Sequence, residues 1–455
     1  MTSYRYRWWA LGFLTTAVFS VSLPATLLNV ALPTLAGELG ASSGELSWFV
    51  SSYLLALTAT LLPAGVAADR WGRKKILLAA IAAFGAGSAL AASATSPSVF
   101  IAAQILSGSA AAAVITTVLA ALATLFDADE RPRAVGVWAA GAFLALPVGP
   151  ILGGLILTSA WWGWAFLATL PVLAAAVVGI AITVPESRSE DPATTRARGL
   201  LRGLHSLLSA RFLSASAMAA LGLFVLFGVL YGMPQYAQAV FGLDPAGSGL
   251  RLLTLLAGVV VAGGLSGRLT GRFGVRAVIA ASFVVLALAM GVGAATIGPD
   301  GSPLTLAWMF AAGLGAGVVM AAASTAALEA VETSRAGLGS ASFQVVQRVG
   351  GGLSALFSAG VLTAGYTAAL GPLPGPVSEA ARRNVFDGLR AADDLRSDAA
   401  AQAIRQALTE GLGHMLWLCC GVAALGAITA VLLLPRRSVA AAPAQREHTT
   451  TKGQP

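Results

Sequence analysis

Long apolar runs dominate this chain, and short polar segments separate them. The 455 residues are 57% hydrophobic and only 11% charged, with a mean hydropathy of +0.79. A soluble domain carries about 25% charged residues, so a chain with so few charges could not cover a water-facing surface. A helix that crosses a bilayer needs about 20 apolar residues. The runs therefore predict a polytopic membrane protein, and the alternating ten-residue pattern of a transmembrane β-barrel is not seen.

Twelve apolar runs predict an all-α fold with 12 transmembrane helices. We expect these helices at residues 8–33, 46–67, 76–95, 99–122, 134–157, 162–184, 212–238, 247–267, 276–297, 304–328, 340–365 and 411–434. The polar stretch 185–211 divides them six and six. The predicted organisation is an N-terminal six-helix half (1–184), a cytoplasmic linker (185–211), a C-terminal six-helix half (212–437) and a disordered cytoplasmic tail (438–455).

The loop charges predict the orientation. Cytoplasmic loops of membrane proteins are enriched in lysine and arginine. Most of the 28 lysines and arginines fall in segments on the same side as the N-terminus. We therefore expect a multi-pass protein of the plasma (inner) membrane with both termini cytoplasmic. The long outer stretch 366–410 is an exception, because it holds five arginines that are offset by six acids; its sequence predicts no role.

The same composition argues against several other classes of protein. The net charge is +8, but the cations lie in short loops between apolar runs, which does not favour nucleic-acid binding. The three histidines lie far apart in the sequence, and the adjacent Cys419 and Cys420 lie inside an apolar run. Neither pattern has metal-ligand spacing. No GxxxxGK loop for ATP occurs, so no cofactor and no metal are expected. A membrane enzyme or sensor without transport activity is the alternative from another class.

A short charged motif occurs twice. The sequence GVAADRWGRK from Gly65 aligns with GRLTGRFGVR from Gly267, an offset of 267 − 65 = 202 residues. Both copies follow the second helix of a predicted half. Two halves related by a repeat are typical of secondary transporters, whose substrate site lies between the halves near the bilayer midplane. The matched pairs are Gly65 with Gly267, Arg70 with Arg272, Trp71 with Phe273 and Gly72 with Gly274, whereas Asp69 is matched by Gly271.

These residues resemble a known family. The pattern G-x-x-x-D-R-x-G-R-K at 65–74 resembles the signature loop of the major facilitator superfamily. Four further stretches resemble its drug:proton antiporters (multidrug efflux type), here in a twelve-helix variant: ATLLNVALP at 25–33, SWFVSSYLLALTATLLPAGVAAD at 47–69, VGPILGG at 148–154 and YGMPQYAQAVFG at 231–242. The resemblance implies alternating-access export of small hydrophobic substrates such as antibiotics, with protons as the coupling partner. We expect the transporter to act as a monomer in the lipid bilayer.

The resemblance also assigns roles to two motifs. Charge pairs of the signature loop close the cytoplasmic side in this family, which implies gating or coupling by Gly65, Asp69, Arg70, Gly72 and Arg73. The alternative is a cationic loop that only fixes topology, which explains Arg73 but not Asp69. The exporter motif of the fifth helix comprises Gly149, Pro150, Gly153 and Gly154. Proline bends a helix and glycine admits a close neighbour, so the alternative is an ordinary bent membrane helix.

Polar residues inside the apolar runs are candidates to line a substrate cavity: Asn29, Tyr53, Gln104, Tyr231, Gln235, Gln344 and Gln347. For each of them, the alternative is a hydrogen bond between helices. Arg348 lies about eight residues, or roughly 12 Å, into its predicted helix. An arginine within the membrane indicates a functional site, with snorkelling toward the inner surface as the alternative. Glu329 is its nearest acidic candidate partner and a second candidate for coupling.

Two positions depart from the antiporter pattern. Pro24 stands where the related antiporters typically carry an acid, and Gln104 stands where they carry an arginine. None of the 20 acids lies well inside a predicted helix. Proton coupling therefore rests on the resemblance, and neutral or weakly charged amphiphiles fit better than strongly cationic ones. A facilitator or importer of a specific metabolite is the second hypothesis, which the missing acids favour and the fifth-helix motif disfavours.

Overall fold

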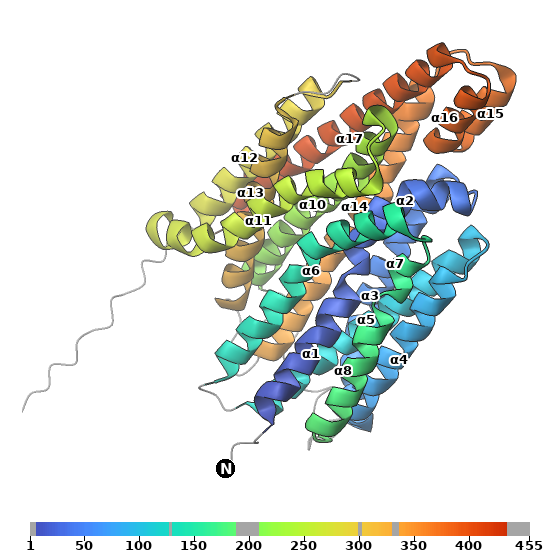
Figure 1. Ribbon diagram of the computed structural model, residues 1–455. Coiled ribbons are helices and arrows are strands. Elements are labelled where there is room, and N and C mark those ends of the chain that lie inside the picture. The colour runs from blue at the N-terminus through green and yellow to red at the C-terminus, as the bar shows by residue number, and fades with distance from the viewer. Residues whose placement is uncertain (1–5, 127–129, 188–208, 299–302, 330–335, 435–455) are drawn as a thin grey trace, which may run out of the picture.

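Long, closely packed helices make up the protein. The computed structural model describes residues 6–126, 130–187, 209–298, 303–329 and 336–434, and every regular element in these ranges is a helix (Figure 1). Within them, 10 helical segments are long and apolar enough to cross a membrane. The prediction of an all-helical membrane protein is confirmed, whereas the count of twelve spans and the orientation stay predictions.

The helices form two packed groups. The first group, blue to green in Figure 1, comprises α1 (Arg7–Ser22), α2 (Pro24–Glu38), α3 (Ser43–Trp71), α4 (Arg73–Ala92), α5 (Pro97–Leu125), α6 (Arg131–Ser159), α7 (Trp164–Leu167) and α8 (Leu170–Thr183). The second group comprises α10 (Ala210–Phe241), α11 (Pro245–Phe273), α12 (Val275–Thr296), α13 (Thr305–Glu329), α14 (Ala336–Ala369), α15 (Gly375–Arg383), α16 (Val385–Asp394) and α17 (Asp398–Leu433). Between the groups, α3 packs against α14 and α6 packs against α11.

The backbone repeats the offset found in the sequence. Helix α11 begins 245 − 43 = 202 residues after α3 begins and ends 273 − 71 = 202 residues after α3 ends. A single glycine separates each of these helices from the next one, and both glycines have a positive φ, 110° at Gly72 and 82° at Gly274. Glycine adopts this backbone conformation readily because it has no Cβ. The two charged motifs are therefore structurally equivalent turns.

The first apolar run is not one continuous helix. Helix α1 ends at Ser22 and α2 begins at Pro24. Proline has no N–H and clashes with the preceding turn, so it disrupts a helix from within but is accepted at a helix start. The carbonyl of Leu23 accepts hydrogen bonds from the N–H groups of Thr26 at 3.1 Å and Leu27 at 3.0 Å, which starts the new helix. Pro24, which departs from the pattern of the antiporters that the sequence resembles, is thus the first residue of a new helix.

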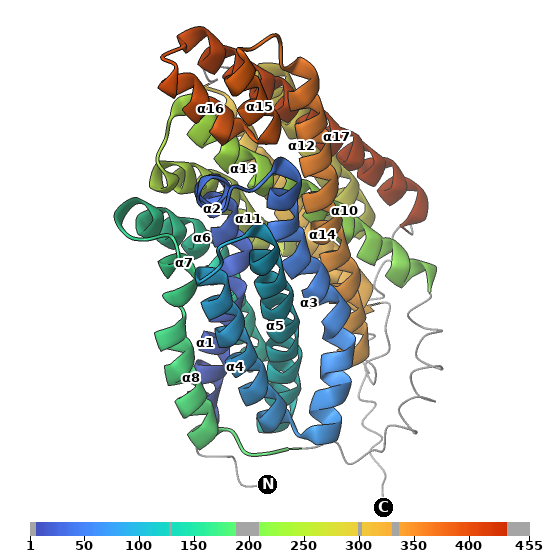
Figure 2. The same cartoon turned by 90° about the vertical axis from the view of Figure 1, so that its right-hand side faces the viewer.

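The stretch 366–410 forms a small helical cap. Helices α15 and α16 pack against each other, and α17 begins 13 residues before the predicted 411 (411 − 398 = 13). Figure 2 shows α15 and α16 over one end of the bundle, which we call the capped end. The opposite ends of the helices, where Gly72 and Gly274 form the repeated turns, are called the basic end because arginine flanks both turns and lysine also follows the first.

Candidate functional site

Hydrogen bonds join the two helix groups at the capped end. Within the described part of the chain, three such bonds cross from one group to the other. They run from Asn384 Nδ2 to the Ala41 carbonyl at 2.9 Å, from Ser43 Oγ to the Arg383 carbonyl at 3.5 Å, and from Gln238 Nε2 to the Val30 carbonyl at 3.1 Å. All three lie toward the capped end, so the helix groups are held together there.

We call these contacts between the helix groups at the capped end the seal. Asn384 makes two kinds of hydrogen bond in it. It is the N-cap of α16, where its Oδ1 accepts a hydrogen bond from the Asp387 N–H at 2.9 Å. Its Nδ2 also donates to Asp387 Oδ2 at 2.8 Å, in addition to the Ala41 carbonyl. The side chain is buried, with a relative exposure of 1%. A single buried amide therefore anchors the cap to its own helix and to the other helix group.

The glycines of the fifth-helix motif lie where helix backbones approach closely. A methyl group at Gly153 would come within 2.9 Å of the Leu27 Cγ on α2, and one at Gly149 would overlap the Thr26 hydroxyl. The Thr26 hydroxyl donates across this contact to the Ala145 carbonyl of α6 at 3.3 Å. Without Cβ atoms, α6 and α2 can pack at short distance.

The same motif also meets the second helix group. A methyl group at Gly154 would overlap the backbone of Ala246 on α11, and one at Gly249 would lie 2.5 Å from the Pro150 carbonyl oxygen. Helix α6 remains unbroken through this region, from Arg131 to Ser159. The motif therefore brings α2, α6 and α11 together and forms part of the seal at the capped end. Its role as an exporter marker stays a prediction.

The signature turn at the basic end is fixed within the first helix group. Glu186, just beyond α8, accepts a hydrogen bond from the Lys74 N–H at 3.1 Å, and the Ser187 carbonyl accepts one from the Arg73 N–H at 3.0 Å. Arg73 Nη1 donates to the Ala120 carbonyl of α5 at 3.2 Å. A carboxylate at the start of α4 also suits the helix dipole. Glu186 was not among the sequence candidates, because its partner lies 112 residues away.

Each repeated turn also stacks an arginine on the aromatic residue that follows it. The Arg70 guanidinium carbon lies 6.0 Å from the centre of the Trp71 ring, and that of Arg272 lies 5.3 Å from the Phe273 ring. The matched pair of residues seen in the sequence is thus a matched contact. The side chains of Asp69 and Glu329 lie outside the described residues, so the charge latch expected from them stays a prediction.

Replacing Gly72 by alanine is expected to destabilise the protein by about 1–2 kcal/mol. Gly72 has a φ of 110°, and a Cβ there would lie 2.6 Å from Glu186 Oε1. Gly65, in the same motif, has open space around it, so Gly65→Ala is the matched control with little expected effect. Thermal unfolding of the purified variants measures the difference. Equal melting temperatures for the two variants would contradict the strain assigned to Gly72.

Two of the cavity candidates make hydrogen bonds within the first helix group. The Tyr53 hydroxyl on α3 donates to the Val21 carbonyl at 2.6 Å, and Gln104 Nε2 on α5 donates to the Phe49 carbonyl at 3.2 Å. Both side chains are buried, as is Asn29 on α2. The structure places Tyr53 and Gln104 in helix-to-helix hydrogen bonds, which was the alternative to substrate contact.

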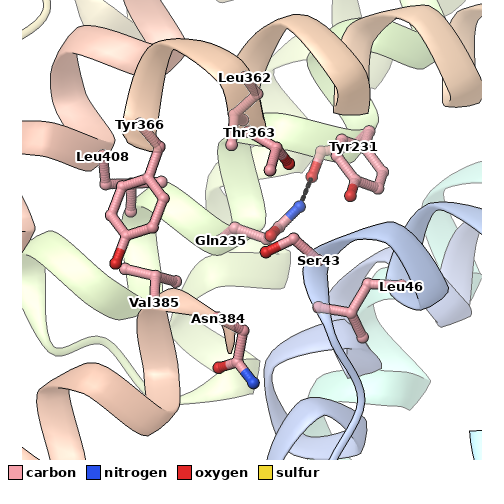
Figure 3. A pocket seen from close by; sticks show the side chains of 10 residues that line it. All are labelled: Ser43, Leu46, Tyr231, Gln235, Leu362, Thr363, Tyr366, Asn384, Val385 and Leu408. Carbon is pink, nitrogen blue, oxygen red and sulfur yellow. Dashed lines mark hydrogen bonds between the residues drawn. The ribbon is translucent and has the colours of Figure 1, made fainter. Parts of the chain in front are cut away.

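Tyr231 and Gln235 line a small cavity between the groups at the capped end (Figure 3). They lie one turn apart on α10, and Gln235 Nε2 donates to the Tyr231 carbonyl at 3.0 Å. The other lining residues come from α3, α14, α16 and its N-cap, and α17: Ser43, Leu46, Leu362, Thr363, Tyr366, Asn384, Val385 and Leu408. The cavity measures about 10 Å³, room for about one water. It is therefore closed to a substrate in this arrangement.

Gln344, Gln347 and Arg348 lie half-buried on α14. Because α14 begins at Ala336, Arg348 is 12 residues, or roughly 18 Å, beyond the helix start, compared with the eight residues that the sequence predicted. Its guanidinium lies close enough to Tyr53 of α3 for an electrostatic interaction. One turn further on, a methyl group at Gly352 would lie 3.1 Å from Leu55 Cδ2. Arg348 is thus at the contact between the two helix groups.

Comparison with known proteins gives one family and one fold. The family model of the Major Facilitator Superfamily matches residues 14–355. The methyl viologen resistance protein SmvA of Salmonella typhimurium is 29% identical over 334 residues, 62% of this chain and 68% of SmvA. The tetracenomycin C resistance and export protein of Streptomyces glaucescens is 26% identical over 407 residues, 76% of this chain and 74% of that protein.

A solved structure shares the fold. A bacterial homologue of the human lysosomal transporter Spinster, in an inward-facing and unoccupied conformation, superposes with a TM-score of 0.76 at 17% identity. The match covers 94% of this chain and 97% of that one. The D-xylose–proton symporter superposes with a TM-score of 0.68 at 15% identity over 95% of this chain and 98% of its own. At these identities, the likeness is one of fold.

Proposed function

The chain belongs to the major facilitator superfamily, a family of transporters rather than enzymes, and on that premise we propose that it exports small hydrophobic or amphiphilic molecules across the plasma membrane. The proposal rests on the seal between the two repeated helix groups, in which the glycines of the fifth-helix motif pack against α11. The relatives named for resistance to methyl viologen and for export of tetracenomycin C support the direction of transport.

The proposed topology has twelve spans in two halves. The broken helices α1–α2 and α7–α8 each count as one span, and α15 and α16 lie outside the membrane. Residues 1–184 and 212–437 are the halves, 185–211 is a cytoplasmic linker and 438–455 is a cytoplasmic tail; most of the linker and all of the tail lie outside the described residues. The cations at the basic end support a cytoplasmic location for that end and for both termini, and the capped end would then face outward.

In this orientation, the contacts between the halves at the capped end support an inward-facing state as part of the proposal. The halves are joined by hydrogen bonds and close helix packing at the capped end. Alternating access requires these contacts to break while new contacts form at the basic end, where Asp69 and Arg70 would provide the latch. The halves then rock around a substrate site near the midplane, as in other repeat-built transporters. The chain acts as a monomer in this proposal, because the two halves of one chain pack against each other and need no second copy.

Export is expected to depend on the proton gradient. In inverted vesicles with an acid interior, a lipophilic fluorescent substrate should accumulate at least several-fold over vesicles without the protein, and collapse of the gradient should abolish accumulation. Asp69 and Glu329 are the proposed coupling acids, since no acid lies well inside the predicted helices. Accumulation that persists after the gradient has collapsed would exclude antiport and favour the facilitator hypothesis.

The same vesicles test the latch. Asp69→Asn is expected to lower accumulation about tenfold, the size of effect that the loss of one partly buried charge interaction has on a conformational equilibrium. Asp394→Asn is the matched control, because Asp394 is an exposed acid at the capped end. If both variants accumulate substrate at the rate of the unaltered protein, Asp69 has no part in the gate.

A further inference from the structure

Arg348 is a cation in an apolar span, and no acid in the described part of the chain forms an ion pair with it. It lies within the 28-residue apolar segment Ser342–Ala369 of α14. Among the described residues it forms no ion pair and no hydrogen bond. Its electrostatic neighbour is Tyr53, whose hydroxyl already donates to the Val21 carbonyl. A charge held inside a membrane protein without a counter-ion is costly and indicates a function.

The acids Asp69, Glu329 and Glu45 of the neighbouring helices lie too far along the bundle to form an ion pair with Arg348. Asp69 is 16 residues from Tyr53 on α3, or roughly 24 Å of helix. Glu329 ends α13, whereas Arg348 is about 18 Å of helix beyond the start of α14. Glu45 lies toward the capped end and forms a capping box with Ser42. Among the residues that the structure describes, the helices around Arg348 therefore supply no carboxylate at its level.

We propose that Arg348 binds the anionic group of the substrate, so that the transported class is amphiphilic monoanions with a carboxylate or sulfonate and an apolar body. This inference rests on the proposed transport function. A guanidinium binds a carboxylate through two parallel hydrogen bonds. Gln344 lies one helical turn before Arg348 and shares its face, so its amide N–H can donate to the same group.

The charge distribution favours anions over cations at this site. A cationic substrate would meet Arg348 without a carboxylate at the same level to offset the repulsion, and electrostatic interactions are strong in a medium of low dielectric constant. The basic end exposes Arg70, Lys75 and Arg272 on the side from which the proposed substrate enters. A positive surface raises the local concentration of anions. The basic end and Arg348 therefore both favour a negatively charged substrate.

Three probes with one skeleton test the selectivity. They are 11-(dansylamino)undecanoic acid, its methyl ester and the analogue with a trimethylammonium group, and their fluorescence reports binding to the purified full-length protein in detergent. The acid is expected to bind about 10- to 100-fold more tightly than the other two, the range that hydrogen bonds to a charged group provide. Arg348→Gln should remove this preference and leave ester binding unchanged, while Arg348→Lys should retain part of it.

Arg251→Gln is the matched control. Arg251 lies on α11 near the capped end with its guanidinium 4.7 Å from the Phe241 ring centre, and its loss should leave acid binding intact. The proposal is overturned if the ammonium probe binds as tightly as the acid, if Arg348→Gln weakens all three probes equally, or if none of the probes binds.

Vesicle transport of the same probes separates this proposal from the proposed function. Export of the ester and the ammonium probe but not of the acid would sustain export and overturn the anion site. Binding of the acid that depends on Arg348, without transport of any of the probes, would sustain the site and overturn export.

Discussion

Replacement of Gly154 by valine is expected to reduce transport by roughly five- to 150-fold. The valine side chain would overlap the backbone of Ala246 at the contact between α6 and α11. Overpacking of this kind costs about 1–3 kcal/mol, and here the cost falls on the state in which the capped end is closed. A shift of that size changes the balance between two states by the stated factor. The transporter would then remain open at the capped end and could not load substrate from the opposite side.

The measurement is vesicle accumulation of a fluorescent substrate, normalised to the amount of protein in the membrane. Gly154→Ala should give a smaller loss, because one methyl group can be accommodated by a small helix shift. Gly360→Val is the matched control, since Gly360 lies on α14 with open space around it. A melting temperature measured for each variant shows whether the protein is folded. Normal transport by a folded Gly154→Val variant would show that the transport cycle does not depend on close packing between α6 and α11.

The repeat and the membrane helices could be predicted from the sequence for a physical reason. A bilayer fixes both the length and the polarity of a spanning helix. Hydropathy alone therefore predicted a helix at 276–297, and the structure has α12 at 275–296. The 202-residue offset is visible because Gly72 and Gly274 both need a positive φ. Where a constraint acts on local sequence, the prediction and the structure agree closely.

The cap could not be predicted in the same way. Helices α15 and α16 do not span the bilayer, so no length rule applies to them. Asn384 bonds to the Ala41 carbonyl across 343 residues of sequence, and Glu186 bonds to the Lys74 N–H across 112. Contacts of this kind depend on tertiary packing and leave no periodic signal. The break before Pro24 is an intermediate case, because the proline was visible although the run was predicted as one helix.

Polar residues inside the predicted membrane helices were identified as candidates from the sequence. The sequence did not show which of them bond to another helix and which could bind a substrate. Tyr53 and Gln104 form hydrogen bonds to the Val21 and Phe49 carbonyls, whereas Arg348 has no hydrogen bond among the described residues. A neutral polar group can be satisfied by one backbone carbonyl, but a guanidinium needs an anion to balance its charge. A cation with no counter-ion among the described residues is therefore the stronger indication of a ligand.

Covalent linkage across the capped end is expected to stop transport almost completely. Ser43 belongs to the first helix group and Arg383 to the cap of the second, and the Ser43 hydroxyl lies 3.5 Å from the Arg383 carbonyl. In the proposed cycle these residues must separate each time substrate is released outward. A bridge between them would hold the closed arrangement that the structure shows, so binding from the basic end should survive while turnover is lost.

The experiment uses Ser43→Cys with Arg383→Cys in a protein whose Cys419 and Cys420 are replaced by alanine, bridged by a short bifunctional methanethiosulfonate reagent. Transport should fall to background and return after reduction. The matched control links Thr60→Cys to Ser109→Cys, whose native hydroxyls lie 3.2 Å apart within the first helix group. That bridge joins α3 to α5, which move together, and should leave transport unchanged. If the bridge at 43 and 383 also leaves transport unchanged, the capped end does not open, and substrate release must follow a route that leaves Asn384 bonded to Ala41.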